Sequence, residues 1–275
     1  MQGGIRRLGR RSRLTQERAT PRWLLALGKE PPPASIELGG SRYELERVFK
    51  HDFFAYTALY GGSAGRIVLK IGRKASFFGL PLGWIGRINA WHESAVLSAL
   101  DDLEIVPRFT GRWGRHGITH EFVEGHELER GERVPADFFP LLAKGLEEIH
   151  RRGFAYVDLE KCENVLVGAD GRPWLFDFQI AYRWPFAHGG DVWPVRWIRQ
   201  RFQAGDRYHL TKLRLRTRPD LFTPEELAAA RDKPFLVRLH GGLTRPITLL
   251  RRLVLRWIDP ERKREGERGR VRIGP

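Results

Sequence analysis

The pattern of hydrophobic and polar positions predicts a small antiparallel sheet early in the chain. Three runs of strand-forming residues lie between residues 43 and 73, separated by HDFFA (51–55) and the glycine turn GGSAG (61–65). β-Branched and aromatic runs bounded by glycine turns are typical of hairpins. The chain is therefore expected to form a three-stranded meander, followed by two short strands near 105–110 and 117–123.

Helical spacing appears in residues 88–100 and again in residues 136–152, where hydrophobic residues recur every three or four positions. The first helical face is expected to comprise Ile88, Trp91, Ala95, Leu97 and Leu100. Gly153 should end the second helix, as glycine commonly does. The capping-box sequence Thr223-Pro224-Glu225-Glu226 predicts that a later helix begins at Pro224.

A β-hairpin is expected between these helices. Residues 164–178 (NVLVGADGRPWLFDF) contain two apolar runs joined by Asp170-Gly171, a turn sequence that favours tight hairpins. Strands followed by helices indicate an α+β fold, and 275 residues with 41% hydrophobic content suit one large domain or two lobes sharing a cleft.

Composition divides the chain into four segments. Clustered arginines and Pro31-Pro32-Pro33 resist compact packing, so residues 1–35 are expected to form a basic flexible arm. Residues 36–124 then form the sheet lobe, residues 125–260 the helical lobe, and residues 261–275 a charged tail.

The formal net charge of +15 makes an anionic partner plausible, whether a nucleotide, an acidic lipid surface or nucleic acid. A general arginine bias would give the same total without a partner. Cys162 is the only cysteine, which excludes an internal disulfide and a cysteine metal cluster and favours a reducing compartment.

No uninterrupted apolar run of about 18 residues occurs, and no apolar run follows the basic N-terminal residues. Neither a transmembrane helix nor a secretory signal is therefore expected. The sequence favours a cytoplasmic protein and leaves open a peripheral contact with the inner face of a membrane.

The segment YVDLEKCENVLVGADGRPWLFDFQ carries candidate chemistry. Phosphoryl transfer requires cations that neutralise developing charge and a carboxylate that orients the attacking hydroxyl, and magnesium prefers hard oxygen ligands. Asp158 falls in a loop after a helix, Asn164 starts the first hairpin strand, and Asp177 ends the second. The hairpin should return Asp177 beside Asn164, so that an amide oxygen and a carboxylate could converge on one metal.

These residues resemble the catalytic loop and Asp-Phe-Gly motif of the protein-kinase-like superfamily. The resemblance implies a bilobal fold with an antiparallel N-lobe, one key helix and a larger, mainly helical C-lobe, and it implies ATP and Mg²⁺ as cofactors. It makes Asp158 the catalytic base or hydroxyl-orienting carboxylate, and makes Asn164 and Asp177 the magnesium ligands.

The same resemblance extends upstream. The sequence IVLK ends at Lys70, which resembles the third-strand lysine that pairs with nucleotide phosphates, and Glu93 resembles its partner glutamate. The hinge candidate is Glu121-Phe122-Val123-Glu124, where Glu121 and Val123 would offer backbone groups to adenine.

Departures from the superfamily pattern indicate a subtype. The Asp158 to Asn164 gap is six positions instead of five, Asp-Phe-Gly becomes Asp-Phe-Gln, and neither a glycine-rich loop nor an Ala-Pro-Glu signature occurs. Residues 50–62 and 153–167 look most like the bacterial lipopolysaccharide core kinases, which phosphorylate Kdo or heptose sugars, with RIO-type kinases as relatives. The implied acceptor is thus a glycolipid sugar. A RIO-like protein serine/threonine kinase and a non-catalytic nucleotide-binding scaffold are the alternatives.

Several features have two readings. Asp206 could buttress the catalytic loop or cap a helix, and the cap is favoured. For contact with the acceptor, the aromatic and arginine-rich residues 183–202 are a better candidate than the basic amphipathic segment 246–258. The basic amphipathic segment 246–258, which Thr244 could cap, is expected to pack on its own core and not on an anionic membrane. His126 is expected to be structural, Cys162 has no assigned role, nucleic acid is not expected, and no partner protein is implied.

Overall fold

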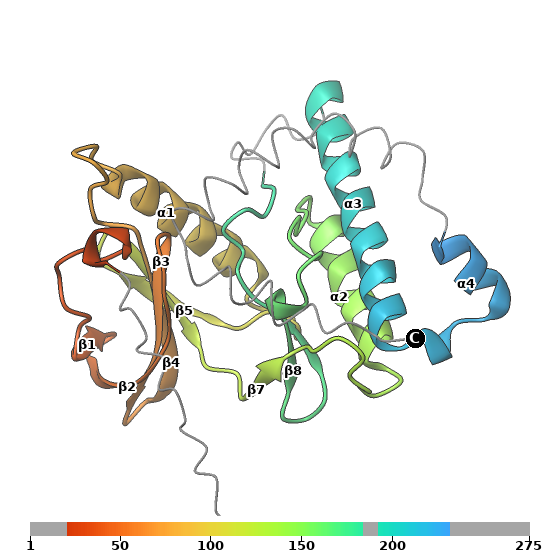
Figure 1. Ribbon diagram of the computed structural model, residues 1–275, viewed down its shortest axis with the longest axis horizontal. Helices are drawn as coiled ribbons and strands as arrows, with labels where there is room; N and C mark the ends of the chain where they lie inside the picture. The colour runs from red at the N-terminus through yellow and green to blue at the C-terminus, as the bar shows by residue number, and fades with distance from the viewer. Residues whose placement is uncertain (1–20, 184–191, 232–275) are drawn as a thin grey trace, which may run out of the picture.

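The computed structural model describes residues 21–183 and 192–231, and it places a sheet-containing lobe beside a mainly helical one (Figure 1). The large sheet has six strands in the order β1-β2-β3-β4-β6-β5, all paired antiparallel. Its strands are β1 (Ser35–Leu38), β2 (Ser41–His51), β3 (Ala55–Gly62), β4 (Gly65–Gly72), β5 (Phe109–Trp113) and β6 (Gly117–Glu121). The meander predicted between residues 43 and 73 is confirmed, and β1 adds an edge strand that the sequence pattern did not reveal.

The strand predicted at 105–110 begins later than expected. Pro107 has no N–H to donate to a sheet, so β5 starts only at Phe109. Ile105 is instead buried against Gly145 of α2 (Phe138–Arg151), where a glycine leaves room for its side chain. The segment before β5 therefore joins the core of the helical lobe.

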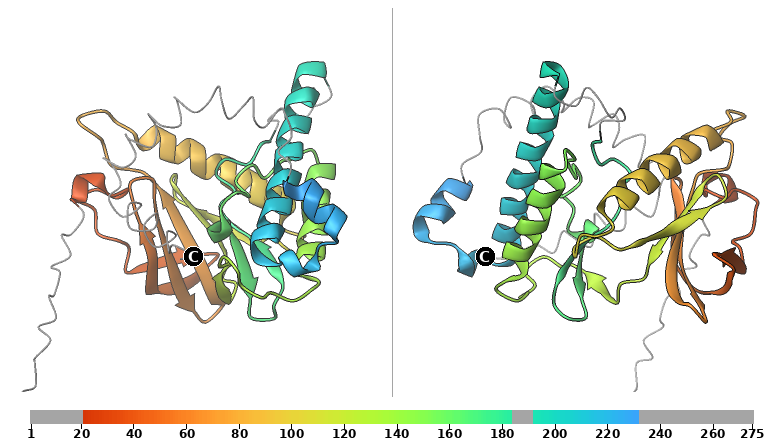
Figure 2. Two further views of the ribbon diagram at one scale, coloured as in Figure 1. Left: turned by 45° about the vertical axis from the view of Figure 1, so that its right-hand side comes forward. Right: turned by 180° about the vertical axis from the view of Figure 1, so that it is seen from behind.

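Helix α1 (Gly83–Leu100) lies against the large sheet (Figures 1 and 2). A Cβ atom on Gly86 would lie 2.2 Å from the backbone oxygen of Arg73, so only glycine allows the helix to approach the end of β4 this closely. Glu93 follows Gly86 by about two helical turns and thus lies on the same inward face. The glycine contact therefore sets the height of Glu93 over the sheet.

The inward face of α1 differs from the face predicted. Leu97 and Leu100 are buried as expected, but Ile88 and Trp91 are about half exposed. The face that meets the sheet instead includes glycine, alanine and glutamate, residues that helical periodicity of large hydrophobics does not select. The helix therefore has apolar residues on two opposite sides.

The helical lobe contains a second, three-stranded sheet in the order β7-β8-β9, with α2 and α3 beside it. The elements after β6 are β7 (Gly125–Glu127), α2, η2 (Cys162–Asn164), β8 (Val165–Gly168), β9 (Pro173–Leu175), α3 (Trp193–Thr217), η3 (Pro219–Leu221) and α4 (Pro224–Arg231). The predicted hairpin is present as β8 and β9, and Gly153 ends α2 with a φ of 85°. The predicted capping box is present too, since Thr223 and Glu226 each bind the backbone N–H of the other.

The prediction of a flexible arm over residues 1–35 is wrong for its last part. Residues 22–24 form a 3₁₀ turn, and Leu24 and Leu27 are buried on the sheet lobe. The buried guanidinium of Arg73 explains why residues 22–27 take a defined structure on the sheet lobe, because a buried cation requires hydrogen-bond acceptors. It donates to four backbone oxygens, those of Trp23, Leu25, Phe53 and Ser76.

Other predicted segments lie outside the described residues. These are residues 1–20 of the arm, the helix expected at 246–258 with its cap Thr244, and the charged tail at 261–275. Within residues 21–183 and 192–231, no helix is both long and apolar enough to span a membrane.

Candidate active site

Lys70 joins the two lobes. From β4, its Nζ atom donates to Glu93 Oε1 of α1 at 2.9 Å and to Asp177 Oδ1, just after β9, at 2.7 Å. The partners are 23 and 107 positions away in the sequence. Three of the residues selected from sequence thus meet at a single ammonium group.

The charges at this junction depend on one another. Burial acts to lower the pKa of Lys70, but the carboxylates of Asp177 and Glu93 outweigh it and raise the pKa. Burial raises the pKa of Glu93, and Lys70 opposes that rise. The charge of Lys70 lowers the pKa of Asp177. Lys70 is therefore held as a cation, and Asp177 as an anion that can also bind a metal.

Asp158 lies in a loop and is bound directly to Asn164. The amide nitrogen of Asn164 donates to Asp158 Oδ2 at 2.9 Å and to the Asp158 backbone oxygen at 3.0 Å. The 3₁₀ turn η2 takes up the extra residue in the six-position gap. The longer loop thus still brings the two residues together.

Lys161 is a site residue that the sequence analysis missed. Its Nζ atom lies 2.5 Å from Asp158 Oδ2, the same oxygen that accepts from Asn164. The signal available in the sequence was a lysine three positions after Asp158, the candidate base. In this position Lys161 can hold the Asp158 carboxylate and bind an anionic phosphate beside it.

Tyr156 links the loop that carries Asp158 to the segment that carries Asp177. Its hydroxyl donates to the backbone oxygen of Phe176, and its ring contacts Phe178 edge-on with centroids 5.1 Å apart. The backbone N–H of Phe176 in turn donates to the Asn164 backbone oxygen at 3.1 Å. Asp177 between the two phenylalanines has a φ of 58°, which is uncommon for a non-glycine residue. The aromatic packing thus holds Asp177 in a strained backbone conformation that aims its carboxylate at Lys70.

Asp206 buttresses the catalytic loop, and the favoured reading of it as a helix cap is wrong. It is fully buried in the middle of α3, where it accepts from the backbone N–H groups of Tyr156 at 2.8 Å and Val157 at 2.7 Å. The ring of His150 binds the same carboxylate at 2.9 Å. Val157 has a φ of 73°, strongly unfavourable for a β-branched residue, and Asp206 compensates for that strain. Local sequence could not decide between the two readings of Asp206, because this contact joins positions about 50 residues apart.

The candidate hinge residues Glu121 and Val123 lie at the end of β6 and just after it. The backbone oxygen of Glu121 accepts a hydrogen bond from Nδ1 of His120 at 2.8 Å, which leaves one lone pair on that oxygen for a ligand. Among the described residues, the backbone N–H and C=O of Val123 have no hydrogen-bond partner. Val123 thus offers a donor and an acceptor of the kind that an adenine edge requires.

The donor set fits magnesium bound together with phosphates. No group of three or more His, Cys, Asp or Glu side chains within metal-binding reach occurs in the described part of the chain. The amide nitrogen of Asn164 faces Asp158, so its oxygen is the atom left for a metal. One amide oxygen and the Asp177 carboxylate suit Mg²⁺, which usually keeps waters and takes its other ligands from substrate phosphates.

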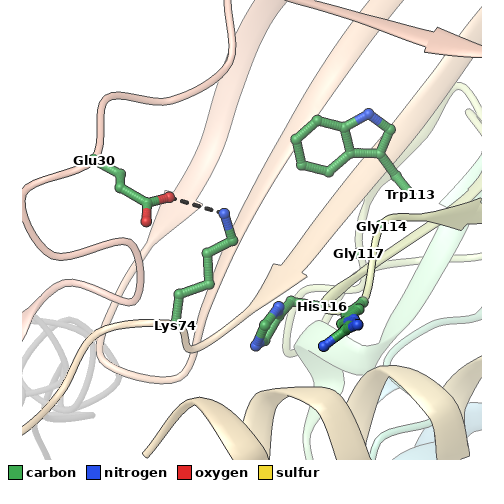
Figure 3. A pocket seen from close by; sticks show the side chains of 7 residues that line it. Glu30, Lys74, Trp113, Gly114, His116 and Gly117 are labelled. Carbon is green, nitrogen blue, oxygen red and sulfur yellow. Dashed lines mark hydrogen bonds and ion pairs between the residues drawn. The ribbon is translucent and has the colours of Figure 1, made fainter. Parts of the chain in front are cut away.

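A hollow of about 490 Å³ lies elsewhere, on the sheet lobe. It is lined by residues including Trp113, His116 and the Glu30–Lys74 ion pair (Figure 3). None of the candidate site residues lines it. It therefore belongs to a different face from the Lys70 junction.

The proposed acceptor-contact stretch 183–202 is described only at its ends. Residues 184–191 lie outside the described residues, and residues from Trp193 onward form the first turns of α3. There Trp193, Trp197 and Phe202 are exposed, and Arg201 lies over the Trp197 ring at 5.5 Å.

Together these elements form an α+β fold, with an antiparallel sheet and one key helix set against a mainly helical part. No family model matches the sequence, and no match is found among curated proteins. Similar solved structures include the Rio2 kinase-ADP/Mg²⁺-phosphoaspartate complex from Chaetomium thermophilum, with 16% identity and a TM-score of 0.48 over 68% of this chain and 63% of that chain. A kinase domain from Plasmodium has 13% identity and a TM-score of 0.45, with 58% and 57% covered. The chain spans less than two thirds of the length of either structure.

Proposed function

We propose that the protein is an ATP- and magnesium-dependent phosphotransferase whose acceptor is a hydroxyl group. The observation that carries the proposal is that Lys70 binds Glu93 and Asp177, while Asn164 binds Asp158 and accepts through its backbone oxygen from Phe176, next to Asp177. Phosphoryl transfer depends on positioning and charge stabilisation more than on covalent chemistry. Lys70 supplies a fixed cation, and Asn164 and Asp177 supply two oxygens for a metal. Asp158 keeps one carboxylate oxygen that neither Asn164 nor Lys161 contacts.

Each residue has a distinct role in the proposed reaction. Val123 and Glu121 hold adenine through backbone groups, and Lys70 binds the α and β phosphates of ATP. Asn164 and Asp177 would hold Mg²⁺, which when bound neutralises charge on the phosphates. Asp158 orients the acceptor hydroxyl and takes its proton as the acceptor oxygen bonds to the γ phosphorus and the bond to ADP breaks.

Lys70 must exchange one partner during this cycle. Its ammonium group donates to Glu93 and Asp177 at once, and ATP phosphates would compete with Asp177 for it. Release of Asp177 from Lys70 would leave that carboxylate available to the metal. The ion pair to Glu93 meanwhile keeps Lys70 aimed into the cleft.

The acceptor we propose is a sugar of a lipopolysaccharide core or similar glycolipid, reached at the cytoplasmic face of a membrane. The exposed indoles of Trp193 and Trp197 support it, since aromatic rings stack on sugar and lipid surfaces and arginines beside them suit phosphorylated groups. A RIO-like protein serine/threonine kinase would share the same catalytic cluster.

An acceptor screen with labelled ATP and Mg²⁺ tests the proposal. We expect label transfer to lipopolysaccharide core sugars, and no transfer by Asp158→Asn or Asp177→Asn. Asp170→Asn, at the hairpin turn, is the matched control and should retain full activity. Label on serine or threonine of protein substrates would favour the RIO-like alternative. Thermal stabilisation by ATP without ADP release from any acceptor would instead identify a nucleotide-binding scaffold.

A further inference from the structure

The outer side of α1 carries a second apolar stripe. At about 100° per residue, Trp84, Ile88 and Trp91 fall within about 60° of one another around the helix. The residues buried on the sheet, among them Glu93 and Leu97, lie about 180° away. Each of the three outer side chains is at least half exposed. Packing within the described structure thus explains only the inner side of this helix.

The segment between β4 and α1 extends the stripe. It projects beyond the first turn of α1 (Figure 1), and Phe77 and Leu80 pair as an isolated bridge. The two residues between them form the tip, with Phe78 at a φ of 47° and Gly79 at 79°. Such turns favour asparagine, aspartate or glycine, so a phenylalanine is conformationally unfavourable there. Phe78 is nevertheless 71% exposed and Leu80 62% exposed. Both apolar side chains thus present most of their surface to solvent.

The tip is held rigidly from behind by other rings. Trp23 lies 5.4 Å from the Phe78 ring and 5.8 Å from the Phe77 ring, and Phe53 contacts Phe77 edge-on at 5.2 Å. Arg73, itself bound to four backbone oxygens, lies 3.8 Å from the centre of the Phe53 ring. The exposed apolar tip is therefore presented on an ordered base.

We propose that this surface docks the protein on an anionic lipid bilayer. The docking surface consists of Trp23, Phe78, Leu80, Trp84, Ile88 and Trp91. Tryptophan and phenylalanine are the side chains that partition into the headgroup region, and a projecting tip suits a fluid bilayer better than a preformed protein groove. This docking rests on the proposed function, because binding to the bilayer would bring the active site to a lipid-linked acceptor.

The charged residues around the docking surface favour a bilayer with anionic headgroups. From residue 74 to residue 92 the chain has no aspartate or glutamate, while Arg87 is exposed on α1 and Arg22 precedes Trp23. The nearby carboxylates of Glu30 and Asp52 are paired with Lys74 and Lys50. Anionic headgroups would attract such an edge, and apolar insertion would then fix it.

Sedimentation of the full chain with lipid vesicles tests the proposal. We expect binding to vesicles containing phosphatidylglycerol and at least about tenfold weaker binding to phosphatidylcholine vesicles. Phe78→Ser with Leu80→Ser should reduce binding to the anionic vesicles by at least about tenfold, because two exposed apolar side chains are removed. Val48→Ser with Phe49→Ser removes two exposed apolar side chains from β2, outside the docking surface, and should leave vesicle binding unchanged.

A second measurement keeps the assignment testable if a tip variant folds poorly. Brominated lipid chains quench tryptophan fluorescence at short range, so they should quench the wild-type protein on anionic vesicles. A variant with Trp23→Phe, Trp84→Phe and Trp91→Phe keeps the apolar surface and should retain binding while losing most of that quenching.

Three results would overturn the docking surface. The first is unchanged vesicle binding in the Phe78/Leu80 variant, and the second is an equal loss of binding in the Val48/Phe49 control. The third is a wild-type protein that does not bind vesicles but forms a dimer, if the tip substitutions abolish that dimer. Phosphotransfer to a soluble, delipidated sugar is measured without vesicles. Failure of vesicle docking therefore leaves the proposed kinase activity untouched, and failure of phosphotransfer leaves the docking result untouched.

Discussion

Asn164 donates its side-chain amide to the carboxylate of Asp158 at 2.9 Å, across a loop one residue longer than in the kinases it resembles. The 3₁₀ turn Cys162–Asn164 shortens the path, because such a turn advances less per residue than an extended chain. The candidate base and the candidate metal ligand are therefore coupled directly.

We predict that Asn164→Ala changes the magnesium requirement. Loss of the amide oxygen should raise the Mg²⁺ concentration for half-maximal activity by about 10- to 100-fold, the range typical when a group that supports a metal is removed. Asn164→Asp keeps an oxygen donor and should show a smaller change. Activity measured against Mg²⁺ concentration checks this, and an unaltered Mg²⁺ curve in Asn164→Ala would remove Asn164 from the metal site.

We predict that Lys70→Met destabilises the fold as well as abolishing activity. The Glu93 carboxylate, only 4% exposed, would lose its cation, which should lower the free energy of unfolding by about 3 kcal/mol or more at neutral pH. Lys70→Met with Glu93→Gln should recover most of that loss without recovering activity.

Urea denaturation of the single and double variants measures this coupling. Lys74→Met is the matched control, because Lys74 pairs with the well-exposed Glu30 and its loss should cost less than about 1 kcal/mol. Equal destabilisation by Lys70→Met and Lys74→Met would contradict a buried pair at Glu93.

We predict that Asp206→Asn acts through the catalytic loop. Tyr156 and Val157 donate to different oxygens of the Asp206 carboxylate, and asparagine replaces one of these oxygens with an NH2 donor. One backbone N–H is therefore left unpaired, at a cost of about 1 to 3 kcal/mol. The kcat should fall while the KM for ATP changes little, because the nucleotide contacts lie elsewhere. Steady-state kinetics and urea denaturation measure the two effects.

Val157→Gly provides the corresponding rescue. Glycine adopts a φ near 73° without strain, so adding it to Asp206→Asn should restore part of the lost stability. Asp220→Asn, in an exposed pair with Arg218, should leave kcat unchanged. A KM effect without a kcat effect in Asp206→Asn would argue against a loop-positioning role.

We predict that His120 makes the fold acid-sensitive. Burial lowers its pKa from 6.5 to about 4, so between these pH values the unfolded chain binds a proton that the folded chain does not. Stability should therefore fall as pH drops from 6.5 toward 4, by at most about 1.4 kcal/mol per pH unit from this residue.

Thermal melts of wild type and His120→Gln across this pH range measure the effect. His120→Gln should flatten the pH dependence, whereas His126→Gln, at an exposed position, should retain the wild-type slope. Parallel slopes for wild type and His120→Gln would show that the acid sensitivity arises elsewhere.

Local sequence was sufficient for elements whose information lies within a few residues. The β8–β9 turn at Asp170-Gly171, the end of α2 at Gly153 and the capping box at Thr223 are set by backbone preferences of nearby residues. The chain order of Lys70, Glu93, Asp158 and Asp177 also predicted which residues would meet, through resemblance to a known pattern.

Hydrophobic periodicity alone did not predict the buried face of a helix that has apolar residues on two sides. Helix α1 is apolar on both sides, and the sequence could not tell which side meets the sheet. The close approach of Gly86 to Arg73 decides it. The order of residues 22–27 likewise depends on Arg73, a buried cation whose acceptors lie up to 50 positions away.

The sequence by itself determined which residues carry the chemistry that we propose, because the order and spacing of Asp158, Asn164 and Asp177 are local properties of one loop and one hairpin. Only the tertiary structure decided what supports that chemistry. Lys161 reaches Asp158 through a specific loop conformation, and Asp206 holds the strained Val157 from a helix about 50 positions later. Buried polar groups must find partners wherever the fold supplies them, and sequence distance carries no information about that choice.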